Sequence, residues 1–121
     1  MIQRVLVADD SKTMRTIIRR SLEALGISEV TEAGDGVEAL SLFQQGQFGL
    51  VLTDWNMPNK NGLDLIRDIR SQNSQVPIIM ITTEAEKRQV MAAIQAGVSD
   101  YLVKPFTAEV LRAKLAKYGC N

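Results

Sequence analysis

Short apolar runs alternate along the chain with segments in which apolar residues recur every three or four positions. The runs lie at residues 4–8, 29–33, 50–53, 78–81 and 101–103, and their length and composition are typical of β-strands. The segments between and after them have the apolar period of amphipathic helices. The chain therefore predicts five repeats of a strand followed by a helix.

The helical segments are predicted from their apolar positions. The first ends at Gly26, a residue common just after a helix C-terminus. The second is predicted over residues 37–45 and the third over residues 63–71. The predicted apolar faces, in chain order, are Met14, Ile17, Ile18, Leu22 and Leu25; Val37, Leu40 and Phe43; Leu63, Ile66 and Ile69; Val90, Met91, Ile94 and Val98; and Leu111, Leu115 and Tyr118.

This alternation predicts a single α/β domain of the (βα)5 type, with a parallel sheet between two layers of helices. Residues 5–8, 50–52 and 78–81 are apolar at every position, as strands covered on both faces must be. Residues 30–33 alternate with polar side chains, so the second strand is predicted at one edge of the sheet and the short fifth strand at the other. A length of 121 residues fits one domain.

Chemically distinctive residues follow four of the five predicted strands. Asp9 and Asp10 come after the first strand and Asp54 after the third. Thr82 follows the fourth strand and Lys104 the fifth, whereas the predicted edge strand at residues 29–33 contributes none. Parallel strands share one carboxyl edge, and ligands of open α/β sheets bind there. We therefore expect these side chains to converge.

Each of these residues also has an ordinary structural explanation. Asp10 could cap the first helix, because Asp is a good N-cap. Asp54 could be a polar residue leaving a strand, Thr82 a strand end or the cap of the fourth helix, and Lys104 a solvated lysine before Pro105. The placement of all four on one rim favours the functional interpretation.

Composition narrows the classes of function. Lys plus Arg and Asp plus Glu each number 14, so no net field attracts nucleic acid or an anionic membrane. The chain lacks an apolar stretch of membrane-spanning length and a signal-peptide pattern, which predicts a cytoplasmic location. Its single cysteine, Cys120, is expected to be inert and mobile. The absence of histidine removes His-based catalysis and His metal sites, and it leaves the chain unable to be a phosphohistidine donor.

Three converging carboxylates need a cation. Two of them about 4 Å apart repel by roughly 4 kcal/mol at an effective dielectric near 20. A helix N-terminus offsets only about 0.3 to 1 kcal/mol per charge. Oxygen ligands without histidine or thiolate favour Mg²⁺. The sequence therefore predicts a magnesium site at Asp9, Asp10 and Asp54.

With Mg²⁺ present, a carboxylate can act as a nucleophile toward phosphorus and form an aspartyl-phosphate. Asp54 stands alone after a central strand, whereas Asp9 and Asp10 form a pair suited to the metal, so Asp54 is the predicted phosphoacceptor. Lys104 would then pair with one phosphoryl oxygen and Thr82 would donate a hydrogen bond to another.

These residues, with the stretch at residues 54–59 (DWNMPN), Ala96-Gly97 and Lys104-Pro105, resemble the receiver domains of bacterial two-component response regulators. The resemblance covers essentially the whole chain, residues 1–121, and is closest to the stand-alone chemotaxis regulators. It implies a three-layer flavodoxin-like (CheY-like) fold with strand order 2-1-3-4-5. It also implies one receiver domain with no output domain.

The resemblance assigns roles at the site. It implies that a histidine kinase phosphorylates Asp54, that Asp10, Asp54 and the backbone carbonyl of Asn56 bind Mg²⁺, and that Asp9 assists through water. Thr82 would then move toward the phosphoryl group and Tyr101 would turn inward. The fourth helix, fifth strand and fifth helix would change their shared surface as a result. Tyr101 could instead be a packing aromatic of an edge strand.

Further implied features concern access and the backbone. Asn56, Thr83 and Glu84 are expected to border the path of water to the phosphoryl group. Thr83 stands where relatives commonly carry alanine, so this path is expected to be narrow. The Lys104–Pro105 peptide is expected to be cis, and Trp55 to be a partly exposed neighbour of the site.

Other functions compete with a receiver domain. A Mg²⁺-dependent aspartyl-phosphate phosphatase of the haloacid-dehalogenase type needs an aspartate two positions after the nucleophile, where this chain has Asn56. A nucleotide-binding module needs a Gly- or Ser/Thr-rich loop after the first strand, and Asp9-Asp10 would repel its phosphate. A phosphorylation-independent interaction domain is the third alternative.

A receiver domain of this kind would work through protein partners. The expected partners are a histidine kinase as phosphodonor and a downstream protein, such as a flagellar switch component or another effector. Nucleic acid and membrane are not expected as partners, and the chain is expected to act as a monomer. Its only chemistry would be self-phosphorylation and autodephosphorylation.

Overall fold

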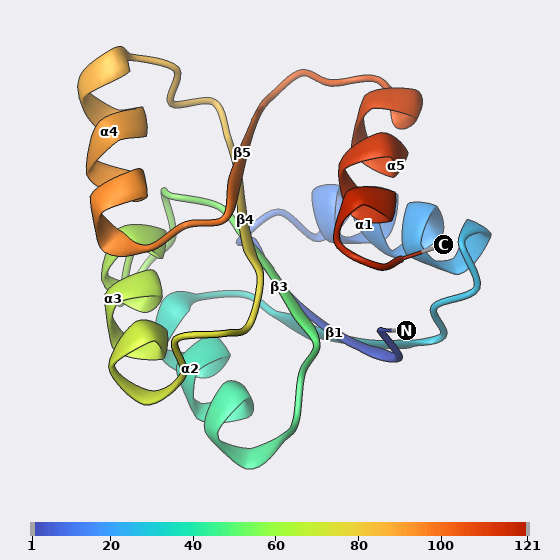
Figure 1. The fold of residues 1–121 in the computed structure, drawn as a ribbon, viewed down its shortest axis with the longest axis horizontal. Helices are drawn as coiled ribbons and strands as arrows, with labels where there is room; N and C mark the ends of the chain where they lie inside the picture. Colours follow the sequence, from blue (N-terminus) through green and yellow to red (C-terminus); the bar gives the residue numbers. More distant parts are fainter. Residues whose placement is uncertain (1, 121) are drawn as a thin grey trace.

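Strands and helices alternate along the chain in the computed structural model, which describes residues 2–120. Within that range they follow the predicted order (Figure 1). Their bounds are β1 (Arg4–Ala8), α1 (Lys12–Ala24), β2 (Glu29–Ala33), α2 (Gly36–Gln45), β3 (Leu50–Thr53), α3 (Gly62–Gln72), β4 (Ile78–Thr82), α4 (Lys87–Ala96), β5 (Asp100–Val103) and α5 (Ala108–Lys117).

The strands form a parallel sheet in the order β2-β1-β3-β4-β5, which confirms the predicted topology. The edge positions of β2 and β5 also agree with their mixed or short apolar runs. The chain reverses its direction of winding between β1 and β3, so the loops after these two strands run to opposite faces of the sheet. In α/β sheets a ligand site lies at the carboxyl ends of such strands.

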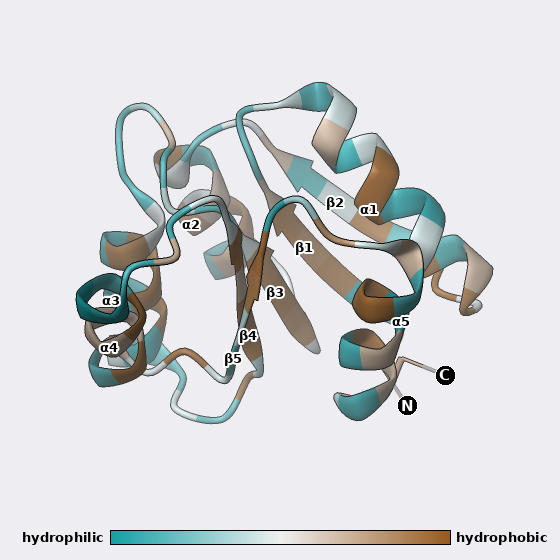
Figure 2. Cartoon of the chain, turned by 90° about the horizontal axis from the view of Figure 1, so that it is seen from above, coloured by the Kyte–Doolittle hydropathy of each residue, from teal (hydrophilic) through white to brown (hydrophobic). Residues whose placement is uncertain are grey.

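Helices cover both faces of the sheet, with α1 and α5 on one face and α2, α3 and α4 on the other (Figure 1). Each face has its own core. Residues 5–8 of β1, 50–52 of β3 and 78–81 of β4 lie between the two cores and are apolar (Figure 2). Ile18, Leu22 and Leu111 pack from α1 and α5 onto one face. Phe43 and Ile66 pack from α2 and α3 onto the other.

Four of the described helices begin at a residue whose side chain accepts a backbone N–H, as N-caps do. Ser11 caps α1, Asp35 caps α2, Asn61 caps α3 and Thr107 caps α5. Glu86 precedes α4 without a side-chain cap bond. These assignments rule out the capping explanations of Asp10 and Thr82, because other residues hold both positions.

Several residues on the predicted apolar faces are exposed. Ile17, Val37, Met91 and Ile94 have relative exposures of 43%, 51%, 49% and 61%, so the core does not cover these members of the predicted apolar faces. On α2 the buried residues are Gly36, Ala39 and Phe43. The helical period gives the direction of an apolar stripe, but it does not say how much of the stripe the sheet covers.

The helices α4 and α5 end earlier in the chain than the sequence predicted. The structure ends α4 at Ala96, because Gly97 adopts the left-handed backbone conformation with φ 107°. Val98 therefore lies in the connection to β5. At the end of α5, Tyr118 is the C-cap rather than a helical residue.

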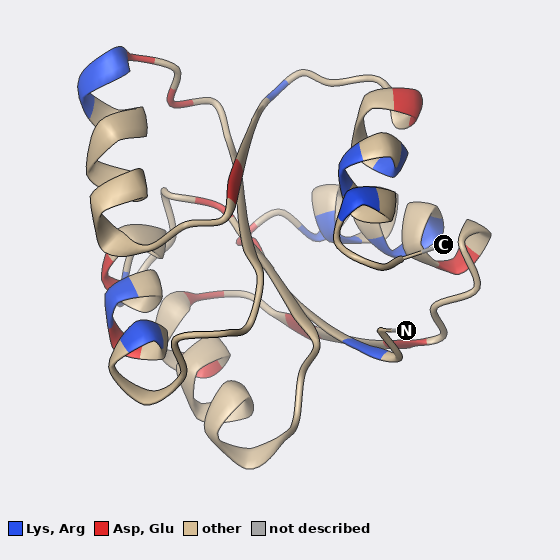
Figure 3. Ribbon diagram, viewed as in Figure 1, with Lys and Arg blue, Asp and Glu red and all other residues tan. Residues whose placement is uncertain are grey.

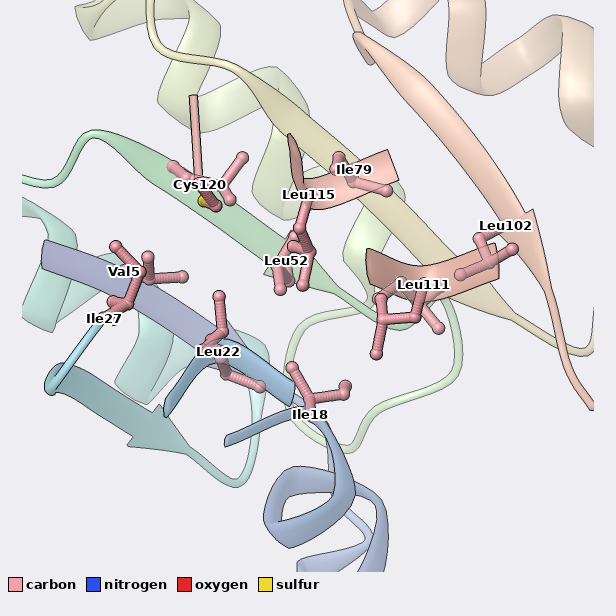
Figure 4. Close-up of a cluster of buried hydrophobic side chains, with 13 residues drawn as sticks. Val5, Ile18, Leu22, Ile27, Leu52, Ile79, Leu102, Leu111, Leu115 and Cys120 are labelled. Carbon is pink, nitrogen blue, oxygen red and sulfur yellow. The ribbon is translucent and has the colours of Figure 1, made fainter. Parts of the chain in front are cut away.

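Cys120 is fully buried, which corrects the expectation of a mobile residue. The chain turns after α5 through Gly119, at φ 98°, and brings the thiol into the core beside Val5, Ile27 and Leu115 (Figure 4). Burial raises the pKa of this thiol. The expectation of an inert thiol stays a prediction, and burial in the core now supports it. Across residues 2–120 the helices are too short or too polar to traverse a membrane.

Candidate functional site

Three carboxylates meet at the carboxyl edge of the two central strands. Asp9 and Asp10 follow β1, and Asp54 follows β3, with Ala8 and Thr53 directly paired across the two strands. One carboxylate oxygen from each aspartate lies within 4.8 Å of the others. Asp9 and Asp54 are 1% and 8% exposed, whereas Asp10 is exposed to solvent. The site thus has two buried acids and one at its mouth.

Lys104 reaches this cluster from the end of β5. Its Nζ donates to Asp54 Oδ2 at 2.8 Å and to Asp9 Oδ2 at 2.9 Å. The Lys104–Pro105 peptide is cis, and the Lys104 amide donates to the carbonyl of Thr82 at 2.8 Å. The side chain therefore bridges the two buried acids from an anchored backbone.

The charges of this cluster perturb one another. Burial raises the pKa of Asp9 despite hydrogen bonds from Lys104 and the Ser11 amide, and repulsion from Asp54 adds to the rise. Burial also opposes the charge of Lys104, but hydrogen bonds and attraction from Asp54 and Asp9 outweigh it and raise the pKa of Lys104. The pKa values of Asp9 and Lys104 are both raised for one reason. Two carboxylates stabilise the single ammonium, whereas Asp9 has to share that ammonium with Asp54. Lys104 is firmly cationic.

Backbone groups fix how the carboxylates point. The amide of Trp55 donates to Asp54 Oδ1 at 2.6 Å, and the amide of Ser11 donates to Asp9 Oδ1 at 2.9 Å. The start of α3 lies against the same backbone, where a Cβ on Gly62 would lie 1.9 Å from the Asp54 carbonyl oxygen. Only glycine allows that approach. One oxygen of each buried acid is thus held by an amide and the other by Lys104.

Polar residues at the end of β4 and in the loops after β3 and β4 form the rim of the site. Thr82 is fully buried, and its Oγ1 accepts a hydrogen bond from the Glu84 amide at 3.3 Å. Asn56 Nδ2 donates to Glu84 Oε1 at 2.7 Å, and Gln89 Nε2 donates to Glu84 Oε2 at 2.7 Å. Thr83 is exposed beside them. The hydrogen bond between Asn56 and Glu84 therefore joins the loop after β3 to the loop after β4.

Tyr101 ties β5 to the same rim. Its hydroxyl donates to the backbone carbonyl of Glu84 at 2.6 Å, and its ring packs on the core that lies under α2 and α3. Burial raises the pKa of Tyr101, and the negative charges of Glu84 and Asp54 raise it further. The side chain thus combines the packing role with a polar contact to the β4–α4 loop.

The donor set can hold a hard cation. Three carboxylates and one ammonium leave an excess of negative charge at the site. Figure 3 shows Lys and Arg residues on the helices α1 and α5. Carboxylate oxygens are ligands of Mg²⁺ and Ca²⁺. The sequence had predicted Asp9, Asp10, Asp54, Thr82 and Lys104 for this edge, and the structure brings all five there.

Some contacts at the site have no signal in the sequence. The Tyr101 hydroxyl meets a backbone carbonyl, which any residue at position 84 would supply. Gln89 is the other case, since it lies on α4 and reaches back to Glu84. Its spacing of five residues from Glu84 is not a helical contact spacing. Both contacts depend on how the β4–α4 loop folds.

Comparison with known proteins agrees with this geometry. The response regulator receiver domain family matches residues 5–116. The chain belongs to this family. The receiver domain is 46% identical over 116 residues to the chemotaxis protein CheY-3 of Vibrio cholerae serotype O1. The aligned residues cover 94% of this chain and 89% of the relative. It is 45% identical to the chemotaxis protein CheY of Pseudomonas aeruginosa, with 94% of each chain covered.

Solved structures give the same assignment. The receiver domain superposes on the chemotaxis response regulator CheY4 of Vibrio cholerae with a TM-score of 0.89 at 34% identity, covering 98% of this chain and 99% of the other. A receiver domain from Francisella superposes with a TM-score of 0.88 at 33% identity, covering 96% and 95%. The protein is therefore a CheY-like response regulator receiver domain, which is a signalling domain with an acidic cluster able to bind a metal.

Proposed function

We propose that this receiver domain accepts a phosphoryl group from a histidine kinase onto Asp54 in a Mg²⁺-dependent reaction. The observation that carries the proposal is the environment of the Asp54 carboxylate. One oxygen faces an ammonium at 2.8 Å, the other accepts a backbone amide at 2.6 Å, and two further acids lie within 4.8 Å. The amide and the ammonium fix the orientation of this carboxylate. A cation held by the neighbouring acids would lie close enough to neutralise the charge of a phosphoryl group on Asp54.

The reaction would transfer one phosphoryl group without a redox step. A carboxylate oxygen of Asp54 attacks phosphorus, the P–N bond of the phosphohistidine breaks, and its electron pair stays on the imidazole, which then takes a proton from solvent. Lys104 exchanges its contact with Asp54 for a phosphoryl oxygen and stabilises the charge that develops there. The histidine must come from the partner, because this chain has none.

Magnesium fits the residues present. Asp10 and Asp54 would hold the ion together with the backbone carbonyl of Asn56, and Asp9 would act through water. When bound, the ion neutralises the carboxylates and polarises the phosphoryl group. Ca²⁺ also takes oxygen ligands, but the few protein ligands here suit an ion that keeps several waters, as Mg²⁺ does.

Phosphorylation would be transmitted through Thr82 and Tyr101. The Thr82 hydroxyl already accepts the Glu84 amide, so its hydrogen can be donated to a phosphoryl oxygen. A shift of Thr82 would carry Glu84 with it, and Tyr101 holds the carbonyl of Glu84. The surface made by α4, β5 and α5 would change in response. Asn56, Thr83 and Glu84 would limit the access of water and so set the lifetime of the phosphoryl group.

We assign this signalling to a chemotaxis-type pathway, because the relatives at 45% and 46% identity are named as chemotaxis proteins. The phosphodonor would be a histidine kinase and the target a protein such as a flagellar switch component or another effector. Residues 1–121 would form one receiver domain that acts as a monomer, with only self-phosphorylation and autodephosphorylation as chemistry. A cytoplasmic location stays a prediction.

Mass spectrometry after incubation with a small phosphodonor tests the proposal. Wild type with Mg²⁺ should gain one phosphoryl group, and peptide mapping should locate it on Asp54. Asp54→Asn should gain none, because an amide is not a nucleophile toward phosphorus, and a chelator should prevent labelling. Equal labelling of Asp54→Asn would contradict the assignment, and a wild type that takes up no phosphoryl group would favour a phosphorylation-independent interaction domain.

A further inference from the structure

The segment between β3 and α3, residues 55–61, carries the backbone carbonyl of Asn56 that the proposed metal site uses. A hydrogen bond from the Gly62 amide to the Trp55 carbonyl, at 2.8 Å, closes its base. Met57 is buried in the core beneath it. A carbonyl ligand cannot adjust through side-chain rotation, so its position depends on how this segment is held.

The start of α2 holds the outer part of this segment. Asp35 uses both carboxylate oxygens, since Oδ1 accepts the Glu38 amide at 2.7 Å and Oδ2 accepts Asn59 Nδ2 at 2.9 Å. Asn59 is in the left-handed conformation, at φ 69°, which Asn tolerates better than most residues. The pKa of Asp35 is lowered by the Glu38 amide and then by Asn59. One carboxylate thus caps a helix and anchors a loop.

The contact is tight at the level of the backbone. A Cβ on Gly36 would lie 2.1 Å from the carbonyl oxygen of Lys60, so the first turn of α2 and the tip of the segment touch without a side chain between them. Lys60 is also paired with Asp68 on α3. The segment is therefore held between α2 and α3 at its far end and by Met57 at its near end.

We propose that Asp35 is a positioning residue for the metal site, which acts through Asn59 to hold residues 55–61 and with them the backbone carbonyl of Asn56 beside Asp54. This inference rests on the proposed metal-dependent function. The side-chain hydrogen bonds of Asp35 go to Glu38 and Asn59, and none goes to Asp9, Asp10 or Asp54. Its effect on the metal site must therefore pass through residues 55–61.

Two single variants break the bridge in different ways. Asp35→Asn keeps an oxygen for the Glu38 amide, so the helix cap survives, but it sets an NH₂ group against the NH₂ group of Asn59. Asn59→Asp sets two carboxylates against each other and keeps a residue that tolerates φ 69°. The double variant exchanges donor and acceptor and restores one hydrogen bond with the wild-type net charge.

The measurement is Mg²⁺ titration followed by the fluorescence of Trp55, the single tryptophan of the chain. Each single variant should raise the Kd for Mg²⁺ about tenfold, the lower end of the effect of outer-shell partners of metal ligands. The double variant should return it to within about twofold of wild type, since the bridge is rebuilt. Circular dichroism and thermal unfolding verify that each variant is folded.

The sign of the Asn59→Asp effect separates positioning from simple electrostatics. That variant adds a negative charge near the metal site, which by Coulomb attraction alone should tighten Mg²⁺ binding. Loss of the bridge should weaken it. Asp64→Asn is the matched control, because it removes an exposed carboxylate at the start of α3 and leaves the bridge intact. It should change the Kd by less than about twofold.

The outcomes distinguish the two proposals. Wild type without any Mg²⁺-dependent change would contradict the metal site itself, and with it this inference. Wild type that binds Mg²⁺, with Asp35→Asn of equal affinity, would contradict only the positioning role. Tighter binding in Asn59→Asp, or a double variant no better than the singles, would also overturn the bridge. Weakening in both singles with recovery in the double supports it.

Discussion

Lys104 sits between two nearly buried carboxylates, Asp9 and Asp54, and its side chain is only 13% exposed. A charge pair of this kind is costly to break from one side, because the remaining charges stay buried without a partner. The same ammonium faces the position that a phosphoryl group would take. The residue is therefore expected to serve both the stability of the site and its chemistry, whereas Thr82, which makes no ion pair, should serve only signalling.

This difference predicts that a variant of Lys104 loses phosphorylation, whereas a variant of Thr82 loses the conformational response to it. Lys104→Met keeps the length of the side chain without its charge and should slow labelling of Asp54 by about 100-fold, the effect of removing one charge-stabilising donor. Thr82→Val keeps its shape without the hydroxyl and should be labelled at a rate close to wild type. NMR of the phosphorylated Thr82→Val should then show reduced shifts of the α4 and β5 amides.

Time courses by mass spectrometry and amide spectra before and after labelling give both readouts. If Lys104→Met is labelled as fast as wild type, Lys104 has no role in the transfer. If Thr82→Val shows the full set of amide shifts, the hydroxyl does not couple phosphorylation to the switch surface.

At the residue scale, the sequence predicts site members that follow a strand directly. Thr82 ends β4, and Asp54 and Lys104 directly follow β3 and β5, so the shared direction of the strands brings them together. Asp35 and Asn59 escape such reasoning, because their contact joins two loops whose paths depend on the packing of α2 against α3. Apolar residues such as Val37 show the same limit, since burial depends on the neighbouring element.

Among the elements, α5 is held to β5 by one carboxylate. Asp100 accepts Lys114 Nζ at 2.9 Å and the Tyr118 hydroxyl at 3.2 Å, while the Tyr101 amide donates to it at 2.8 Å. Lys117 lies 3.6 Å away. Burial opposes the charge, but the hydrogen bonds from Lys114 and the Tyr101 amide outweigh it, so the pKa of Asp100 is lowered.

A lowered pKa makes this contribution to stability depend on pH. The ionised form is favoured in the folded state, so the stabilisation is complete above the unfolded pKa of about 3.9 and is lost as pH falls through the lower folded pKa. Asp100→Asn should therefore reduce the free energy of unfolding by about 1 kcal/mol at pH 7. The difference from wild type should shrink as the pH falls below about 4.

Urea unfolding of both proteins at several pH values between 7 and 3 measures this difference. Glu23→Gln is the control, because it removes an exposed carboxylate near the C-terminus of α1, where the helix dipole does not stabilise an acid. It should not destabilise the protein at any pH. A difference between wild type and Asp100→Asn that stays constant down to pH 3 would show that the carboxylate charge does not hold α5.

The helix α4 is attached differently. Its N-terminus has no side-chain cap bond, and Ala93 is its one fully buried residue. Its C-terminal end is held from α3, where Arg70 Nε donates to the Gly97 carbonyl at 2.8 Å. The periodicity of Val90, Met91 and Ile94 predicted this helix but could not reveal its loose cover of the sheet. An N-terminus of α4 without a side-chain cap bond is compatible with movement of this helix in the proposed switch.

At the scale of the whole molecule, the fold follows from the order of apolar runs, and the site follows from the fold. The alternation of strands and helices permits a parallel sheet, and the apolar composition of β1, β3 and β4 places them in the centre. The reversal of winding between β1 and β3 then sets Asp9 beside Asp54. Like charges gather at this point, and their repulsion is expected to reduce the stability of the fold.

This conflict predicts that the metal and the Asp10 carboxylate act on stability in opposite directions. Without Mg²⁺, Asp10→Asn should be more stable than wild type by about 1 kcal/mol, the repulsion between two charges 4 Å apart in water-like surroundings. With Mg²⁺ at 100 times its Kd, wild type should gain about 2.7 kcal/mol by linkage, which for a domain of this size is about 10 °C in Tm. Asp10→Asn should gain much less, because a ligand is missing.

Thermal unfolding gives the Tm of wild type and of Asp10→Asn, each measured with Mg²⁺ and with chelator. Glu23→Gln, which removes an exposed carboxylate of α1 far along the helix from Asp10, should respond to Mg²⁺ as wild type does. If Asp10→Asn gains as much Tm from Mg²⁺ as wild type, Asp10 is not a metal ligand. If it is instead less stable than wild type in chelator, the carboxylates of the site do not repel one another, and the need for a cation loses its physical basis.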